Sequence, residues 1–228
     1  MLRLLAVLTA CLALLAAGCG EDSEPAATPE AEATEAAANE FLPEGCENVP
    51  APEPREAGTL EAPKEKLAKS KTYVATVSTT CGDFEITLDA KRAPITGGSF
   101  KYLADQKFFD GLTFHRIVAD FVIQGGDPAG DGSGGPGFTV VEAPPDDLTY
   151  DPGVVAMAKT QTEPAGASGS QFFVVTGAGA SSLPPDYALL GKVTKGMEVA
   201  TKIGAIQADQ SGAPAAQVVI KSITVQES

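Results

Sequence analysis

One stretch, residues 114–127, constrains the fold of this chain more than any other; it reads F-H-R-I-V-A-D-F-V-I-Q-G-G-D. Two short runs of strand-forming residues, 114–118 and 121–123, flank a polar break, and a glycine pair ends the second run and lets the backbone turn. Side chains alternate between the two faces of a strand, so we expect Phe114 and Arg116 on the same face. A cation held beside apolar surface loses favourable hydration, which costs free energy, so its position here indicates a functional role.

The remaining pattern predicts short strands and two helices. Alternating apolar residues predict strands at 73–78, 83–88, 154–158, 171–175, 188–190 and 217–225. One helix should begin near Pro94, with Phe100 and Leu103 facing the core, and a second should span 196–205. Gly97-Gly98 weakens the first helix, so packing must hold it. Many short strands with two helices fit a mainly β fold, a closed antiparallel barrel capped by the helices.

Two motifs in this chain resemble a known family. The pattern F-H-R-x-x-x-x-F-x-I-Q-G-G-D is similar to the central signature of the cyclophilin-type peptidyl-prolyl isomerases, and G-S-Q-F-F-V at 169–174 resembles the family's other signature strand. Met157-Ala158 and Gly191-Lys192-Val193 follow in the family's order, and the resemblance covers about residues 71–225. It implies an eight-stranded cyclophilin-like barrel and an isomerase of X-Pro bonds that needs no cofactor and no metal.

The resemblance also implies a role for particular residues. Arg116 would be the electrostatic catalyst, Gln124 would orient the peptide, and Phe121 would serve both the catalytic group and the proline pocket. The other residues of the proline pocket would be Val122, Phe173, Leu183 and Tyr187. Residues before the proline would be bound by Gly132, Ala158, Lys159, Thr160 and Gln171. Phe172, next to a pocket residue, is expected in the core.

This set of residue types suits rotation about an X-Pro bond. The trans amide is favoured by only about 0.5–1 kcal/mol, but a barrier of roughly 18–20 kcal/mol separates the isomers. No proton has to move, so a fixed cation at the twisted nitrogen and an apolar pocket for the ring are sufficient. The alternative is a binding module or holdase that grips proline-containing segments, with turnover incidental. Arg116 and Gln124 together favour the enzyme.

The chain departs from the family pattern at several positions. Val122 stands where methionine is common, and Tyr187 replaces a histidine. Lys159-Thr160 replaces an Asn-Ala pair, about three residues are inserted after it, and Ser182 aligns with a tryptophan. The first two changes leave the chemistry intact, whereas the others concern substrate preference and drug binding.

Two further motifs point to other chemistry; the first is rejected, and the second is kept only as a weak alternative. Gly130-x-Gly132-x-x-Gly135 resembles a dinucleotide fingerprint, but Pro128 precedes it and Pro136 follows, so no helix can begin there to receive a pyrophosphate. The same stretch resembles a serine-protease motif with one residue inserted, but the single histidine, His115, is too close in sequence for a catalytic triad. We expect His115 to be packed and hydrogen-bonded.

Acidic charge is concentrated before the folded part. The net charge is −14, and residues 20–63 hold twelve Asp or Glu, one basic residue and seven prolines. This composition cannot bury enough apolar surface to offset the entropy of ordering, so it predicts a disordered tether over 19–70 and a folded domain over 71–228. Acidic residues outnumber lysine and arginine by 30 to 16, and we expect no basic patch, which argues against nucleic acid as a partner.

Residues 1–18 are predicted to be a lipoprotein signal peptide. The apolar run 4–17 follows Arg3 and is shorter than the roughly 20 residues that span a bilayer. Its end, L-A-A-G-C, resembles the bacterial lipobox, in which the cysteine, here Cys19, is lipid-modified. The alternative is an ordinary signal peptide cleaved near Gly18. We therefore expect a monomer anchored outside the cytoplasm to the bacterial cell membrane, which binds proline-containing segments of unfolded or flexible polypeptides.

Two cysteines remain once the leader and the anchor are set aside. Cys46 lies in the tether and Cys81 at a turn between two strands. Disulfides persist in exported proteins, so we favour a bridge between them that pins the end of the tether to the barrel edge. The alternative is two free thiols.

Overall fold

The computed structural model describes residues 40–228. The predicted signal peptide, Cys19 and the first part of the acidic segment lie outside the described residues. Within residues 40–228, the helices are too short or too polar for any of them to cross a membrane.

Short strands dominate the chain from residue 73 onward, as the alternating patterns predict. In chain order the elements are β1 (Tyr73–Thr79), β2 (Gly82–Leu88), α2 (Pro94–Asp105), β3 (Arg116–Val118), β4 (Val122–Gly125), β5 (Val140–Val141), β6 (Val154–Met157), β7 (Ala167–Ser168), β8 (Phe172–Val175), the 3-10 helix η1 (Ala178–Ser182), β9 (Leu189–Lys195), α3 (Met197–Gly204) and β10 (Ile220–Glu227). The strand pairs are antiparallel. The predicted mainly β class with two packed helices is confirmed.

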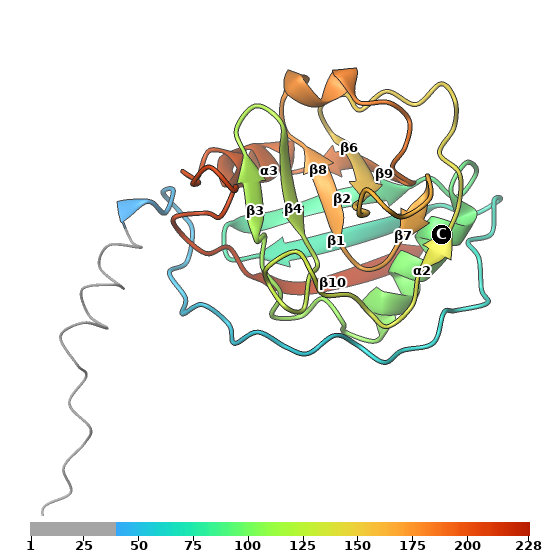
Figure 1. Cartoon of the computed structure of the whole chain (residues 1–228), viewed down its shortest axis with the longest axis horizontal. Helices are drawn as coiled ribbons and strands as arrows, with labels where there is room; N and C mark the ends of the chain where they lie inside the picture. The colour runs from blue at the N-terminus through green and yellow to red at the C-terminus, as the bar shows by residue number, and fades with distance from the viewer. Residues whose placement is uncertain (1–39) are drawn as a thin grey trace, which may run out of the picture.

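Eight strands form one curved sheet, but the sheet does not close. Their order is β10-β1-β2-β9-β6-β8-β4-β3, while β5 pairs separately with β7 (Figure 1). The prediction of a closed barrel is therefore wrong, because the edge strands β10 and β3 share no ladder. The segments that precede the two edge strands are linked by an isolated β-bridge. Its partners are Thr113, just before β3, and Val219, just before β10. Along the edge itself, the N–H of Ile117 donates to the carbonyl of Gly212 over 2.8 Å, so a loop occupies the position that a closing strand would take.

Strand β8 separates the core from the opposite face of the sheet. Phe172 and Val174 belong to the main core, whereas Phe173 and Val175 belong to a second apolar cluster. Phe172 is fully buried, as predicted, and its ring lies 5.5 Å from that of Phe100, measured between centroids. Alternation along one strand thus supplies both the stability of the domain and one wall of a surface site.

The predicted sharing of a face by Phe114 and Arg116 is wrong. Phe114 is fully buried in the core together with Ile117, whereas Arg116 is half-buried. The regular strand begins only at Arg116, so the residue before it need not follow the alternation.

Helix α2 carries a glycine pair where a second segment of the chain lies against it. Phe100 and Leu103 are fully buried, as predicted. A Cβ at Gly98 would lie 2.6 Å from the carbonyl oxygen of Glu65, and one at Gly97 would overlap the Leu67 side chain. The two glycines lower the helix propensity, but they let residues 65–67 approach closely.

Those residues end a segment, residues 46–67, that we call the belt. A disulfide joins Cys46 to Cys81, the pairing favoured from the sequence. At the other end Leu67 is buried, and its N–H donates to the carbonyl of Pro94 over 3.0 Å. Figure 1 shows the belt, in blue, running round the outside of the domain towards α2.

The predicted disorder of residues 19–70 therefore fails for their described part. Composition alone counts the few apolar residues of this segment, and it takes no account of a covalent link or of backbone hydrogen bonds to the domain. Leu60 packs against the main core, and the N–H of Glu47 donates to the carbonyl of Thr80 over 2.7 Å. Together with the disulfide, these contacts offset the entropy lost on ordering.

Candidate active site

The site is built on three neighbouring strands whose register places its residues in one row. Arg116 on β3 lies opposite Gln124 on β4, and Gln124 lies opposite Phe173 on β8. Residues directly opposite in adjacent strands share a face of the sheet. The guanidinium of Arg116 donates to the Gln124 side-chain oxygen over 3.3 Å, and both side chains are half-buried. A charged donor, an amide and an aromatic ring therefore lie side by side.

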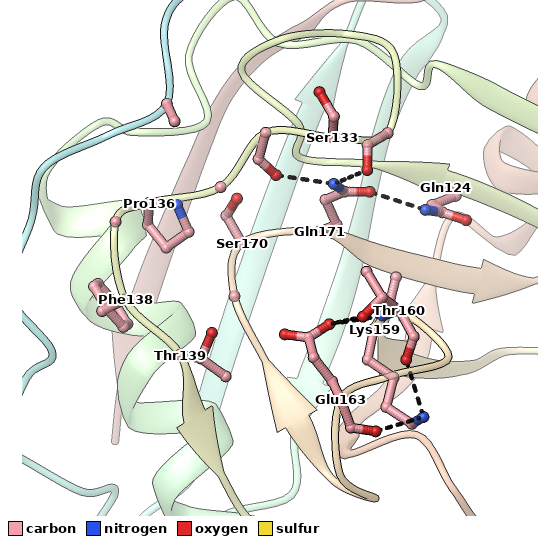
Figure 2. A pocket seen from close by; sticks show the side chains of 17 residues that line it. Gln124, Ser133, Pro136, Phe138, Thr139, Lys159, Thr160, Glu163, Ser170 and Gln171 are labelled. Atoms are coloured by element: carbon pink, nitrogen blue, oxygen red, sulfur yellow. Dashed lines mark hydrogen bonds between the residues drawn. The ribbon is translucent and has the colours of Figure 1, made fainter.

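A second amide, that of Gln171, extends this row towards a glycine-rich loop, residues 128–137 (Figure 2). The Gln124 amide donates to the Gln171 side-chain oxygen over 3.0 Å. The Gln171 amide in turn donates to the carbonyls of Gly132 and Gly134, each over 2.9 Å. Arg116 is thus connected through two glutamines to the backbone of the loop.

A buried carboxylate fixes the backbone of the glycine-rich loop. Asp127 is 1% exposed, and its side chain accepts hydrogen bonds from the backbone N–H groups of Ala129, Asp131 and Gly132. Three donors on one carboxylate satisfy a charge that would otherwise be expensive to bury.

A cleft of about 490 Å³ lies between the glycine-rich loop and the segment around residues 158–163. Figure 2 shows Gln171 and Gln124 at its inner end, with Ser133 on one side and Thr160 on the other. Of the residues predicted to bind peptide before the proline, all line this cleft, namely Gly132, Ala158, Lys159, Thr160 and Gln171. An extended peptide could lie here with its proline at the far end of the glutamine row.

The predicted proline-pocket residues gather in the second apolar cluster, which we call the apolar patch; they are Phe121, Val122, Phe173, Leu183 and Tyr187. The rings of Phe173 and Tyr187 meet edge to face with their centroids 5.4 Å apart. Phe173 is 5% exposed and Val122 is 2% exposed, whereas Phe121, Leu183 and Tyr187 are partly open to solvent. The patch offers aromatic and aliphatic walls beside the row that ends at Arg116.

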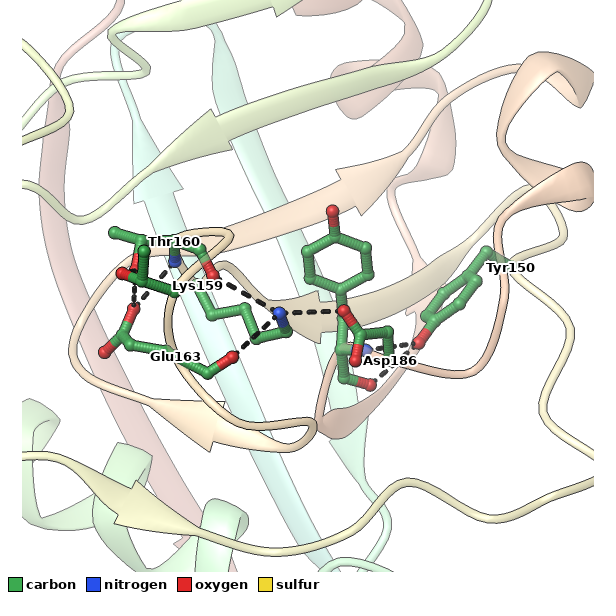
Figure 3. A network of polar contacts seen from close by, with 7 residues as sticks. Tyr150, Lys159, Thr160, Glu163 and Asp186 are labelled. Atoms are coloured by element: carbon green, nitrogen blue, oxygen red, sulfur yellow. Dashed lines mark hydrogen bonds and ion pairs between the residues drawn. The ribbon is translucent and has the colours of Figure 1, made fainter.

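Tyr187 is fixed from two sides. Its backbone N–H and carbonyl both bond to the hydroxyl of Tyr150, over 2.9 and 2.8 Å. Burial raises the pKa of Tyr150 to about 12, so this hydroxyl stays protonated and can donate. On the other side the Lys159 ammonium lies 5.7 Å from the centre of the Tyr187 ring (Figure 3). The orientation of this pocket wall is thus determined by buried polar partners.

The Lys159 charge is directed into its own loop and not into the cleft. Its side chain is 5% exposed, and the ammonium pairs with Asp186 over 2.7 Å. The same group donates to the carbonyls of Thr160 and Glu163, each over 3.2 Å. Thr160 bonds to the Glu163 carboxylate through its N–H and its hydroxyl. Lys159 and Thr160 therefore line the cleft, while their polar groups stabilise the loop that carries the inserted residues.

His115 is packed, as expected, but it is not hydrogen-bonded. It is half-buried, and neither ring nitrogen has a hydrogen-bond partner within the described part of the chain. Burial lowers its pKa, with a smaller opposing effect of the Asp127 charge. The imidazole is therefore uncharged near neutral pH.

Three contributors to the site were not identified from the sequence. Gly212 (φ +91°) approaches so closely that a Cβ there would lie 2.9 Å from the Cγ of Arg116. Asp127 organises the glycine-rich loop, and its place in the first signature motif was the one signal available. Ala57 of the belt lines the cleft, and nothing in its composition suggested this.

Comparison with known proteins finds relatives over the same part of the chain. Residues 74–225 match the family model described as Cyclophilin type peptidyl-prolyl cis-trans isomerase/CLD. The chain is 41% identical over 117 residues to peptidyl-prolyl cis-trans isomerase B of Bacillus subtilis, covering 51% of this chain and 79% of that protein. It is 34% identical over 172 residues to peptidyl-prolyl cis-trans isomerase A of Mycobacterium tuberculosis, covering 68% and 92%.

Solved structures agree with the sequence comparison. A crystal structure of a cyclophilin type peptidyl-prolyl cis-trans isomerase from Cryptosporidium parvum has a TM-score of 0.61 at 29% identity, covering 68% of this chain and 98% of that one. A crystal structure of that protein in the presence of the dipeptide Ala-Pro gives a TM-score of 0.60 at 30% identity, covering 67% and 98%.

Proposed function

Since the chain belongs to the cyclophilin-type peptidyl-prolyl cis-trans isomerase family, we propose that Arg116 speeds rotation about X-Pro bonds by stabilising the twisted amide. Isomerase activity comes with membership of the family, and the role of Arg116 is our proposal. The observation that carries it is the row of Arg116, Gln124 and Phe173 on one face of three adjacent strands.

The barrier to rotation arises from amide resonance. In the twisted state the proline nitrogen regains a lone pair, which a cationic N–H donor stabilises only while the amide is twisted. Arginine suits this role because it stays charged and its planar fork can also reach a carbonyl oxygen. Since Gln124 holds the guanidinium in place beforehand, little reorganisation is needed as the amide twists.

The apolar patch and the cleft would hold the two sides of the bond. The pyrrolidine ring packs between Phe173 and Tyr187, and the residues before the proline lie along the cleft beside Gln171. With the ring anchored, rotation moves the other side of the amide past Arg116. The crystal structure of the parasite relative in the presence of the dipeptide Ala-Pro supports a substrate of this class.

An Arg116→Ala variant tests the proposal. We expect kcat/KM on an X-Pro peptide to fall at least tenfold, about 1.4 kcal/mol of transition-state stabilisation, with the thermal midpoint little changed. The measurement is a protease-coupled isomerisation assay. A matched control is Arg92→Ala, which removes an exposed arginine paired with Asp147 and should leave turnover unchanged.

Near-wild-type turnover of Arg116→Ala would contradict this mechanism. If the variant loses turnover but still suppresses aggregation of an unfolded protein, proline-segment binding is separable from catalysis. That result would leave a holdase role open beside the isomerase.

We further propose that the enzyme acts on proteins outside the cytoplasm while anchored by a lipid on Cys19. The support is the leader pattern that ends in L-A-A-G-C at 15–19 and the disulfide in the belt, which an oxidising compartment preserves. Twenty-seven positions separate Cys19 from Cys46, where the belt begins.

A Cys19→Ser variant tests the anchor. We expect the protein to move from the membrane fraction to the soluble fraction, because the substitution removes the thiol that would carry the lipid. Fractionation followed by immunoblotting measures this, with Cys11→Ser in the leader as the matched control. Unchanged membrane association of Cys19→Ser would favour an ordinary signal peptide.

A further inference from the structure

We propose that the belt is part of the catalytic domain's peptide site, because residues 55–60 position the glycine-rich loop and, through it, Gln171. The inference rests on the proposed role of the glutamine row in holding peptide. It assigns a positioning function to a segment that precedes the region matched by the family model, which begins at residue 74.

The belt lies alongside the loop and donates three backbone hydrogen bonds to it. The N–H of Arg55 donates to the carbonyl of Pro128 over 2.8 Å. Further along, Gly58 donates to Gly135 over 2.8 Å and Leu60 donates to Pro136 over 2.9 Å. Donors two residues apart here meet adjacent carbonyls, so the contact is an irregular backbone pairing and not a regular strand ladder.

Close packing makes this contact specific. A Cβ at Gly58 would lie 2.7 Å from the carbonyl oxygen of Pro136, so a larger residue at position 58 cannot keep the same approach. Arg55 fixes the register, because its guanidinium donates to the carbonyl of Phe108 over 2.7 Å and lies 5.9 Å from the centre of the Phe108 ring. Leu60 packs against the main core.

The loop needs such support because of its own backbone. Gly130, Gly132 and Gly137 all have positive φ, and a glycine-rich loop loses much conformational entropy when it is ordered. Asp127 holds the first half of the loop, and the belt holds the second half. Between the two lie the carbonyls of Gly132 and Gly134, which accept both hydrogen bonds from the Gln171 amide.

The belt therefore reaches the catalytic row by a continuous path. Residues 55–60 hold the loop, the loop holds Gln171, Gln171 holds Gln124, and Gln124 bonds to Arg116. Ala57 also lines the cleft itself, on the side that would face peptide residues before the proline. Loss of the belt contact should consequently weaken peptide binding without removing any group that touches the rotating bond.

A double-mutant cycle in the otherwise unchanged mature protein tests this path. We expect Gly58→Val to lower kcat/KM on a proline-containing hexapeptide about three- to tenfold. In a Gln171→Ala background the same change should cost less than about 1.5-fold, because residues that act through one partner are not additive. The matched control is Thr224→Val, which changes an exposed β-branched residue on β10 outside the belt and should alter activity in neither background.

Arg55→Ala provides a second route if Gly58→Val folds poorly, since Arg55 is exposed and its removal creates no clash. It should show the same dependence on Gln171, with a smaller effect. Equal losses in both backgrounds, or no loss for either variant, would overturn the positioning role. If Gln171→Ala alone leaves activity unchanged, the proposed role of the glutamine row fails, and the belt path through it fails with it. If Gln171→Ala lowers activity and the belt variants do not, only the belt inference fails.

Discussion

Arg116 depends on backbone that approaches it from a distant part of the chain. The Asp209 carboxylate accepts hydrogen bonds from Ser211 and Ala213, which folds that loop back so that Gly212 lies against the arginine stem. Only a glycine permits this approach at a positive φ. Arg116, for which we propose the catalytic role, could be named from its motif. Gly212 could not, because nothing local to it indicates which side chain it will meet.

His115 gives a prediction about pH. Its pKa is lowered, mainly by burial, while Asp127 and Asp131 oppose the shift and Arg116 adds to it. The unfolded chain has an ordinary histidine pKa near 6.5, so below about that pH it binds a proton that the folded protein does not. The contribution of neutral His115 to the free energy of unfolding is therefore fully present above about pH 6.5, and it is lost as the pH falls towards the pKa of His115 in the folded protein.

We expect the urea midpoint of the wild type to fall more between pH 7 and pH 5 than that of His115→Gln. Carboxylates titrate in both proteins, so the difference between the two curves isolates the histidine. Parallel curves over that range would show that His115 is as accessible to protons in the folded state as in the unfolded state. Turnover should stay nearly constant from pH 6 to 9 because rotation of the amide moves no proton.

At the scale of the elements, the site follows from the alternation of side chains along strands that also contribute to the main core. β4, β6 and β8 each place one set of side chains in the main core and the other set in the apolar patch. This part was predictable, because period-two patterns and signature motifs lie within the strands themselves. The glycine-rich loop and the inserted loop were not predictable, because each also depends on a partner far away in the sequence, Gln171 for the first and Asp186 for the second.

The inserted loop yields a prediction through Lys159. Lys159→Met keeps the apolar stem but leaves two carbonyls without their donor, and we expect a loss of about 1–3 kcal/mol in the free energy of unfolding. Asp186 is 40% exposed and can be hydrated, so the loss should be smaller than for a fully buried ion pair. KM for an X-Pro peptide should rise two- to fivefold, because Tyr187 loses the cation beside its ring.

Chemical denaturation and steady-state kinetics measure the two effects. The control is Lys91→Met, which removes an exposed lysine and should change neither quantity. An unchanged KM with lowered stability would mean that Lys159 holds the loop without orienting the pocket wall.

The domain as a whole was predicted in class but not in closure or extent. Alternating apolar patterns located most of the strands and both helices, and two motifs at the correct spacing identified the residues of the row. The open edge depends on whether the chain before β10 pairs with β3 or with other backbone, which a local pattern cannot decide. The belt was predicted as disordered because composition treats a segment in isolation, whereas Cys46 and Leu67 tie both of its ends to the folded domain.

The disulfide therefore belongs to the whole molecule, and it yields the last prediction. It joins residues 35 positions apart, and closing such a loop in the unfolded chain stabilises the fold by about 3–4 kcal/mol in the chain-entropy treatment. Replacing both cysteines with alanine should lower the free energy of unfolding by about that amount. Activity should fall less than twofold, because residues 55–60 keep their own hydrogen bonds to the loop when the protein is folded.

Urea unfolding with and without reductant, after peptide mapping of the protein purified under non-reducing conditions, measures this. Reductant should lower the wild-type midpoint and leave the midpoint of the Cys46→Ala, Cys81→Ala protein unchanged, which separates the bridge from any other effect of the reagent. Two freely alkylated thiols in the protein purified under non-reducing conditions would refute the bridge itself. A large loss of activity in the folded double variant would mean that the belt had left the glycine-rich loop. The disulfide, more than the belt's own hydrogen bonds, would then hold the belt at the site.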